Sequence, residues 1–151
     1  MKKRLLVTGA NGMLGGTLVK LFQEKFDVFA TGNKISSFSF IILYLSFDLD
    51  NRSFADLIEW SKPDIIIHCA AITKGNYCQQ NPNEAFKING VSLKRFTDVV
   101  NKGTRIIYIS TDAVFSSQLN MATEKDCPRP ENVYGKSKEL GEFFLINSGA
   151  E

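Results

Sequence analysis

The sequence predicts an α/β protein with a doubly wound parallel sheet. Two observations lead to this fold class. Short apolar runs typical of strands alternate along the chain with amphipathic stretches typical of helices. One of these runs, residues 64–69, carries three successive isoleucines, as strands buried on both faces of a parallel sheet do. A length of 151 residues fits one domain, 1–151, with a single core.

Five strands are expected in the order in which their apolar runs occur. They cover residues 5–8, 27–31, 41–47, 64–69 and 105–110. Helices in the intervals imply right-handed crossovers, so all five strands would run parallel. Ligands of such sheets bind at the carboxyl ends of the strands, and residues 9–15, 70–71 and 110–111 fall there.

Four helices are expected between and after these strands. The first covers residues 13–25 and would bury one apolar face, formed by Leu14, Leu18, Leu21 and Phe22. A short helix around residues 54–58 ends before Pro63. A long helix towards residue 100 would begin with Asn81 as N-cap and Pro82 in the first turn. Residues 116–132 are polar and predict a loop, followed by a last helix over 134–148.

A glycine-rich turn follows the first expected strand. Its glycines are spaced three residues apart and open the first helix. Such a turn lets the backbone approach a pyrophosphate, whose charge the helix N-terminus stabilises. The alternative is a tight turn without a ligand. We interpret the turn as a dinucleotide site formed by Gly9, Asn11, Gly12, Met13, Leu14 and Gly15.

Tyr134 and Lys138 lie four residues apart, on one face of the last expected helix. An ammonium near a phenol favours the phenolate, so this tyrosine can exchange a proton with an alkoxide or alcohol. Thr111, at the end of the fifth strand, can hydrogen-bond the same oxygen. The alternative is an exposed pair without a function. With the glycine turn, the pair predicts hydride transfer on a nicotinamide cofactor, with Tyr134 at the mouth of the cofactor groove.

Composition and charge argue against several other functions. A net charge of +2 gives no reason to expect nucleic acid or a membrane as partner. The longest apolar segment is too short to span a bilayer, and the expected location is the cytoplasm. Cys69, Cys78 and Cys127 lack metal spacing, so no metal is expected. His68, the one histidine, is interpreted as a packed residue near the cofactor cleft.

Motifs over almost the whole chain carry a resemblance to a known family. They are residues 8–15, 69–73, 80–82 with Ala85 and Asn89, 109–115, and 132–138 with Gly141 and Glu142. The chain resembles the extended short-chain dehydrogenase/reductases, and within them is most similar to the dTDP-4-dehydrorhamnose reductase family. The resemblance implies a Rossmann-like fold.

That resemblance also implies an activity. Thr111, Tyr134 and Lys138 would be the catalytic trio, and Lys138 would also hydrogen-bond the nicotinamide ribose. Asn89 would brace the loop after the fifth strand. The implied reaction is the NAD(P)H-dependent reduction of a 4-keto group on a nucleotide-linked deoxysugar. The implied partner is therefore a nucleotide-linked keto sugar.

The cofactor residues follow from the same resemblance. Ala70 and Ala71 would line the cofactor cleft, and Asp48 with Leu49 would flank the adenine. After the second strand no acidic residue is available for the adenosine 2′-hydroxyl. Lys34 can instead pair with a 2′-phosphate, which favours NADP over NAD. The alternative is a solvated surface lysine.

The chain departs from the family in two respects. Ser116 and Ser117 replace the usual Asp-Gly in a loop that borders the sugar, which leaves the sugar open. Family members are nearly twice as long, so the resemblance implies that the last strands and the substrate-binding C-terminal portion are absent. We therefore expect poor turnover by the isolated chain. An uncovered apolar edge would favour association into a homo-oligomer.

Two alternatives to a reductase stay open. A nucleotide-sugar epimerase or dehydratase uses the same trio but retains its NAD. A non-catalytic binding subunit is the other, because the regulatory subunit of methionine adenosyltransferase resembles the same family and works through partner contact. The intact trio favours an enzyme.

Overall fold

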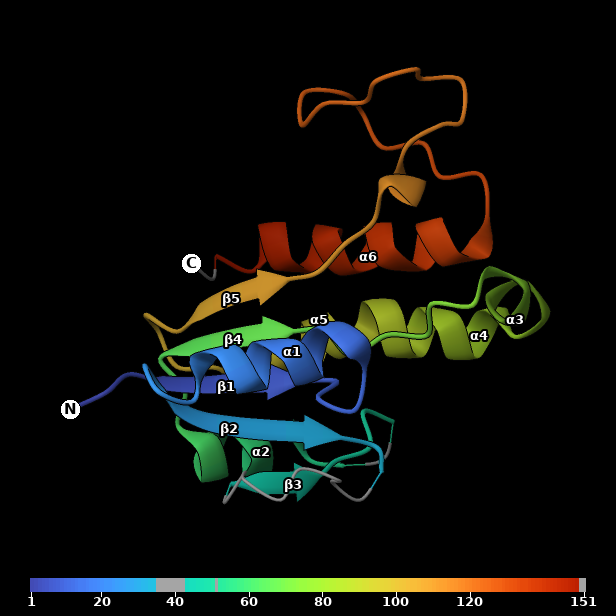
Figure 1. The fold of residues 1–151 in the computed structure, drawn as a ribbon. Coiled ribbons are helices and arrows are strands. Elements are labelled where there is room, and N and C mark those ends of the chain that lie inside the picture. Colours follow the sequence, from blue (N-terminus) through green and yellow to red (C-terminus); the bar gives the residue numbers. More distant parts are fainter. Residues whose placement is uncertain (35–42, 51, 150–151) are drawn as a thin grey trace. The chain divides into compact units, whose positions relative to one another are not determined.

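A computed structural model describes residues 1–34, 43–50 and 52–149 of the protein. The chain divides into two compact units. The first contains Met1–Ala70 and Asp98–Ile109, and the second contains Ala71–Thr97 and Ser110–Gly149. The first unit holds a parallel sheet with flanking helices, which confirms the predicted α/β class (Figure 1).

Five parallel strands form the sheet of the first unit. In chain order they are β1 (Arg4–Thr8), β2 (Asp27–Gly32), β3 (Tyr44–Ser46), β4 (Ile65–His68) and β5 (Arg105–Tyr108). Their order in the sheet is β3-β2-β1-β4-β5. Thr8 pairs with Thr31 of β2 and with His68 of β4, so the three strands end at one edge. Strand order reverses between β1 and β4, the point where ligands bind in such sheets.

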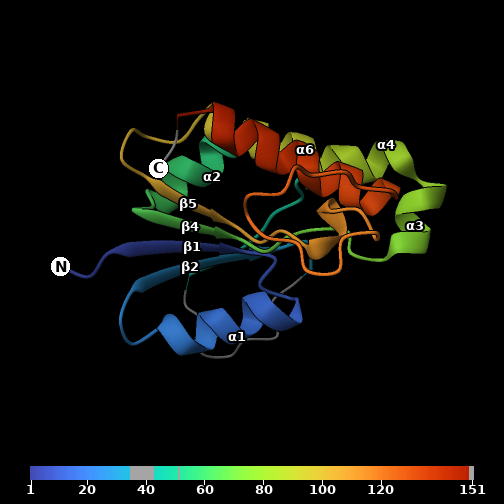
Figure 2. The same cartoon turned by 90° about the horizontal axis from the view of Figure 1, so that it is seen from above.

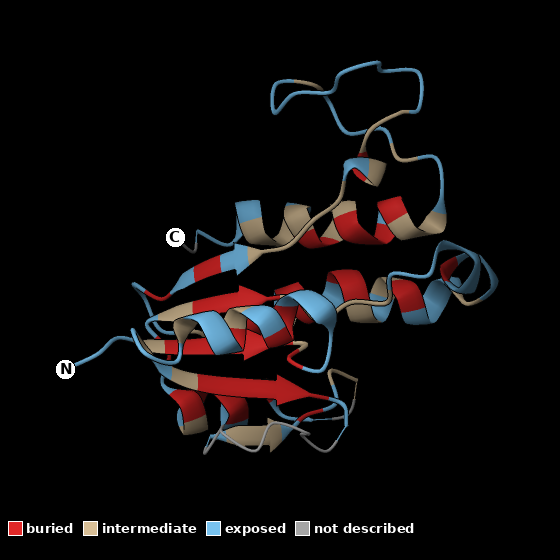
Figure 3. Ribbon diagram, in the orientation of Figure 1, coloured by how far each residue is buried: buried red, intermediate tan, exposed pale blue. Residues whose placement is uncertain are grey.

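All five predicted strands are present, with small differences at their ends. The third strand, predicted over residues 41–47, is present as the shorter β3. Residues 41 and 42 of the predicted range lie outside the described part of the chain. The fifth ends at Tyr108, earlier than predicted. Figure 3 shows that β1, β2 and β4 are largely buried, whereas β5 at the edge of the sheet is partly exposed. Ile107 of β5 is among its exposed residues.

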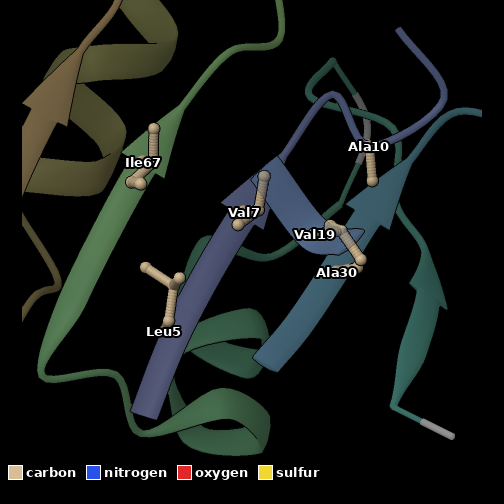
Figure 4. Packing of buried hydrophobic residues seen from close by; sticks show 6 residues of the cluster. All are labelled: Leu5, Val7, Ala10, Val19, Ala30 and Ile67. Atoms are coloured by element: carbon tan, nitrogen blue, oxygen red, sulfur yellow. The ribbon is translucent and has the colours of Figure 1, made fainter. Parts of the chain in front are cut away.

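Two helices cover opposite faces of this sheet (Figure 2). They are α1 (Met13–Phe22) and α2 (Phe54–Ser61). The Asp56 N–H donates to the Ser53 hydroxyl at 3.3 Å, which caps the start of α2. The core on the α1 side is shown in Figure 4 and consists of Leu5, Val7, Ala10, Val19, Ala30 and Ile67.

The predicted buried face of α1 was wrong in part. Leu14 and Leu21 are exposed, whereas Leu18 and Phe22 pack against the core as predicted. The buried positions are Gly15, Gly16 and Val19. A Cβ at Gly15 would lie 2.4 Å from the Gly9 carbonyl oxygen. Because this part of the helix packs backbone to backbone, the glycines determine which face of its first turn is buried. The helix also ends at residue 22, earlier than the predicted residue 25.

The regular elements described in the second unit are all helices or helical turns. Its elements are α3 (Gly75–Gln80), α4 (Pro82–Ala85), the π-helix η1 (Phe86–Val91), α5 (Ser92–Thr97), the 3₁₀ turn η2 (Asp112–Val114) and α6 (Val133–Asn147). The predicted loop over 116–132 and the last helix are confirmed. None of the helices described in either unit has the length and apolar character needed to cross a bilayer.

The long helix predicted from residue 81 to 100 differs from the structure in three ways. It passes through the π-helix η1 and ends at Thr97. It is preceded by α3, which was not predicted. The Asn81 side chain does not cap it, because its amide donates instead to the Tyr77 carbonyl at 3.1 Å.

Candidate functional site

The glycine turn after β1 lies against Ala70, the second residue after the end of β4. Gly9 has a φ of +68°, in the left-handed region that favours glycine. A Cβ at Gly9 would lie 2.7 Å from the Ala70 nitrogen. The Gly12 N–H donates to the Gly9 carbonyl at 2.9 Å, which closes the turn. The predicted cofactor residues 9–15 and Ala70 therefore meet where the strand order reverses.

The N-terminus of α1 is open to an anion. Gly12 is the N-cap, no side chain caps the helix, and no acidic residue lies in its first turn. The first intrahelical bond is the one from the Gly16 N–H to the Gly12 carbonyl, so the N–H groups of Met13 and Leu14 have no acceptor within the helix. These groups and the helix dipole favour bound negative charge.

Two buried polar side chains, those of Thr8 and His68, form hydrogen bonds at this edge of the sheet. The Ala70 N–H donates to the Thr8 hydroxyl at 3.2 Å, and that hydroxyl lies 2.8 Å from Nδ1 of His68. The His68 ring stacks on Tyr108, with the ring centroids 5.9 Å apart. His68 is fully buried, which confirms its interpretation as a packed residue.

The residues expected at the adenosine end lie along the same edge. Lys34 follows β2 and is exposed. Asp48 and Leu49 follow β3. The N–H of Phe47, just after the end of β3, donates to the carbonyl of Gly32, the last residue of β2, at 2.8 Å. One Asp48 carboxylate oxygen accepts from the Asp50 N–H at 2.9 Å. Both strand ends therefore present their predicted residues at the ligand-binding edge.

In the second unit, α6 carries Tyr134 and Lys138. The helix begins after Asn132, whose side-chain oxygen accepts from the Gly135 N–H at 2.8 Å. Lys138, one turn after Tyr134, is only 2% exposed. Lysine is almost never fully buried in proteins unless it is paired. Lys138 does have interactions within the protein, as such burial requires.

A glycine brings the segment of Thr111 against the start of α6. A Cβ at Gly135 would lie 2.1 Å from the Ala113 carbonyl oxygen. The Ala113 N–H donates to the Thr111 hydroxyl at 3.2 Å, and this hydroxyl donates to the Asp112 carboxylate at 3.1 Å. Gly135 was not predicted as a site residue. A glycine in the first turn of a helix, where it lowers helix propensity, is the signal that marks such a close approach.

Asn89, in the π-helix η1, joins two segments of this unit. Its amide accepts from the Ile72 N–H at 2.8 Å and donates to the Ile72 carbonyl at 3.0 Å. It also lies 2.9 Å from the Ser137 hydroxyl, which donates to the Tyr134 carbonyl at 2.7 Å. Asn89 therefore braces the segment after β4 against α6. Its expected role in bracing the loop after the fifth strand stays a prediction. The role of Ser137 was not predicted.

The serines that depart from the family pattern bind a carboxylate. Glu131 accepts from the hydroxyl of Ser116 at 2.8 Å, and from the N–H of Ser117 at 2.9 Å. The Ser117 hydroxyl also contacts both carboxylate oxygens. These contacts tie together the two ends of the loop that joins η2 to α6. Glu131 was not predicted either, and no local pattern in the sequence pairs it with serines so far away.

The predicted site residues thus form two groups, one in each unit. The first unit holds Gly9, Asn11, Gly12, Met13, Leu14, Gly15, Lys34, Asp48, Leu49 and Ala70. The second unit holds Ala71, Thr111, Tyr134 and Lys138. The fold is a Rossmann-like α/β fold, with a glycine turn at the point where the strand order reverses.

Residues 2–151 match the family described as RmlD substrate binding domain, and the chain belongs to that family. The spore coat polysaccharide biosynthesis protein SpsK of Bacillus subtilis is 32% identical over 145 residues, covering 94% of this chain and 48% of that protein. Methionine adenosyltransferase 2 subunit beta of Rattus norvegicus is 34% identical over 148 residues, covering 97% of this chain and 43% of the relative. The chain thus spans less than half the length of these relatives.

Solved structures agree with this assignment. The dTDP-4-dehydrorhamnose reductase of Bacillus anthracis, solved in complex with NADP, is 33% identical with a TM-score of 0.81. The match covers 97% of this chain and 50% of that chain. The resemblance inferred from the sequence motifs is therefore confirmed, together with the expectation that the chain corresponds to part of the longer reductases.

The fit at the glycine turn predicts an unequal effect of two alanines. Gly103→Ala serves as the control, because Gly103 has a φ of +88° but no atom near its missing Cβ. It should lower the free energy of unfolding by about 1 kcal/mol through backbone strain alone. Gly9→Ala adds a clash with Ala70 and should lower it by about 3 kcal/mol. Urea unfolding measures both, and equal losses would contradict the close fit.

The Glu131 contacts predict an acid-sensitive loop. Hydrogen bonds from the Ser116 hydroxyl, and then from Ser117, lower the pKa of the Glu131 carboxyl. A lowered folded-state pKa means that the contacts stabilise the loop above the ordinary pKa and are lost as the pH falls through the lowered value. At neutral pH, Glu131→Gln should speed hydrogen exchange of the Ser117 amide by about threefold. Glu124→Gln in the same loop is the control, and equal exchange in both variants would refute the role of Glu131.

Proposed function

We propose that this chain is the cofactor-binding and catalytic part of an NAD(P)H-dependent reductase of 4-keto nucleotide sugars. The burial of Lys138 one turn after Tyr134 supports this proposal most strongly. Removing an ammonium from water is costly unless partners compensate it. A lysine on the same helix face as a tyrosine can stabilise the phenolate that remains when the tyrosine gives up its proton.

Each group has a role in the proposed reaction. When bound, a reduced nicotinamide would supply a hydride to the carbonyl carbon of the sugar. Tyr134 gives its phenolic proton to the carbonyl oxygen as the C=O bond becomes an alcohol, and Thr111 hydrogen-bonds that oxygen. Lys138 stabilises the resulting phenolate and holds the nicotinamide ribose. The N–H groups at the start of α1 bind the pyrophosphate, as the open helix end favours.

The remaining cofactor residues belong to this proposal as well. Ala70 and Ala71 line the cofactor cleft, and Asp48 with Leu49 flank the adenine. Lys34 pairs with the 2′-phosphate of NADP. The NADP complex of the similar Bacillus anthracis reductase supports this choice. The protein works in the cytoplasm in this proposal, without a nucleic acid, membrane or metal partner.

A second candidate is a binding subunit without turnover. The similarity to methionine adenosyltransferase 2 subunit beta favours it. Such a subunit would bind a catalytic methionine adenosyltransferase chain, whether or not it holds a dinucleotide. An epimerase or dehydratase with a retained NAD would use the same trio, but no single contact in the structure favours it over a reductase.

The decisive experiment combines binding and turnover. NADPH binding to the purified chain is followed by fluorescence, and nicotinamide oxidation is assayed with a panel of nucleotide-linked keto sugars. Tyr134→Phe should reduce the slow turnover at least about 100-fold, because the proton donor is lost. NADPH affinity should change by less than about threefold, since the phenol contributes little to ground-state binding. Turnover that survives this substitution would refute the mechanism, and binding to a methionine adenosyltransferase chain without oxidation would support the second candidate.

Cofactor preference provides a separate prediction. Lys34→Ala should weaken NADPH binding about fivefold, the effect of losing one solvent-exposed charge pair worth about 1 kcal/mol. NADH affinity should stay the same, because NADH lacks the 2′-phosphate. Lys20→Ala on α1 is the matched control for a lost surface cation. Competition binding of NADPH and NADH measures the preference. An unchanged preference in Lys34→Ala would show that Lys34 does not bind the 2′-phosphate.

A further inference from the structure

Tyr44, the first residue of β3, contacts two loops at the carboxyl edge of the sheet. Its hydroxyl lies 2.9 Å from the side-chain oxygen of Asn11, in the glycine turn. The same hydroxyl contacts the main-chain carbonyl of Lys34, after β2. The Lys34 N–H in turn donates to the Asn11 side-chain oxygen at 3.4 Å. The three residues form a closed set of contacts that we call the Tyr44 bridge.

The Tyr44 bridge depends on a glycine at the end of β2. A Cβ at Gly32 would lie 1.9 Å from the Asn11 side-chain oxygen and 3.0 Å from the Tyr44 hydroxyl oxygen. Any other residue at this position would displace the Asn11 amide. The glycine turn is therefore joined to the end of β2 by side-chain chemistry as well as by the sheet.

The tyrosine acts in this bridge as a hydrogen-bond donor. Burial raises the pKa of the Tyr44 phenol. The phenol therefore keeps its proton well above neutral pH. A protonated hydroxyl can donate to either oxygen that it contacts, the Asn11 amide or the Lys34 carbonyl. The Lys34 main chain thus has a hydrogen-bond partner at its N–H, the Asn11 oxygen, and one within reach of its carbonyl, the Tyr44 hydroxyl.

We propose that Tyr44 is a positioning residue for cofactor discrimination, which holds Lys34 at a fixed place relative to the pyrophosphate-binding turn. This inference rests on the proposed function and specifies how the adenosine end of the dinucleotide is selected. Lysine is a point charge on a flexible stem, so its contribution to phosphate binding depends on how much freedom it loses. Fixing its main chain in advance reduces that loss. The ligand feature recognised is a phosphate on the adenosine 2′ position.

Binding of two small probes to the whole chain tests this proposal. The probes are ADP-ribose and 2′-phospho-ADP-ribose, which differ only in the 2′-phosphate. In Tyr44→Phe the preference for 2′-phospho-ADP-ribose should fall about threefold, while the affinity for ADP-ribose should change less than about twofold. Tyr77→Phe is the matched control, because it removes a hydroxyl that donates to Glu84 at 2.7 Å, in the second unit. Its preference should equal that of the unmodified chain.

A double variant separates positioning from a general structural role. If Tyr44 acts through Lys34, then Tyr44→Phe combined with Lys34→Ala should lose no more preference than Lys34→Ala alone. Losses that multiply would overturn the inference. Gly32→Ala, which displaces the Asn11 amide, should lower the same preference and keeps the test informative if Tyr44→Phe folds poorly.

The outcomes distinguish this inference from the function on which it rests. If the unmodified chain binds neither probe, the proposed dinucleotide function fails and the inference fails with it. If both probes bind but the preference is unchanged in Tyr44→Phe and in Gly32→Ala, only the inference is overturned.

Discussion

The approach of Gly9 to Ala70 is the constraint on which the site in the first unit depends. β1 and β4 are adjacent and parallel, so the segments that leave their carboxyl ends compete for the same space. Only a residue without a Cβ, at a positive φ, fits there. The turn then places the Gly9 carbonyl where α1 must approach it, which requires a second glycine at position 15. The helix that results begins with open N–H groups at the point where the strand order reverses.

In the second unit, glycines likewise allow neighbouring segments to approach closely, and here they position α6. Small residues let α6 approach its neighbours closely, since a Cβ at Gly90 would lie 2.8 Å from Leu140 and one at Gly135 would meet Ala113. Between these contacts, Asn89 and Ser137 fix the helix by buried hydrogen bonds. Asn89 lies in a π-helix, an irregularity that is frequent at functional sites. This packing holds Tyr134 at the start of α6 and buries Lys138 one turn later.

The sequence predicted the elements better than it predicted their contacts. Apolar runs identify the strands because a buried parallel strand must be apolar on both faces, as β4 is. The buried face of α1 was wrong in part because two glycines, which carry no hydrophobic signal, belong to it. The π-helix and the contact of Asn89 with Ile72 depend on partners far apart in the chain, which periodicity does not report. The glycine turn and the Tyr134–Lys138 pair could be recognised because both motifs are local.

The two candidate functions make different demands on these residues. A subunit that acts only by contact with a partner can keep an open helix N-terminus and a glycine turn, because both also serve a bound dinucleotide that is never oxidised. For such a subunit, a lysine that folding removes from water could serve the nicotinamide ribose but not a proton transfer. Taking an ammonium out of water costs several kcal/mol before its partners compensate it. An apolar residue of similar size would fill the same space on α6 without that cost, so packing alone does not account for this lysine, whereas the phenolate of the proposed reductase would.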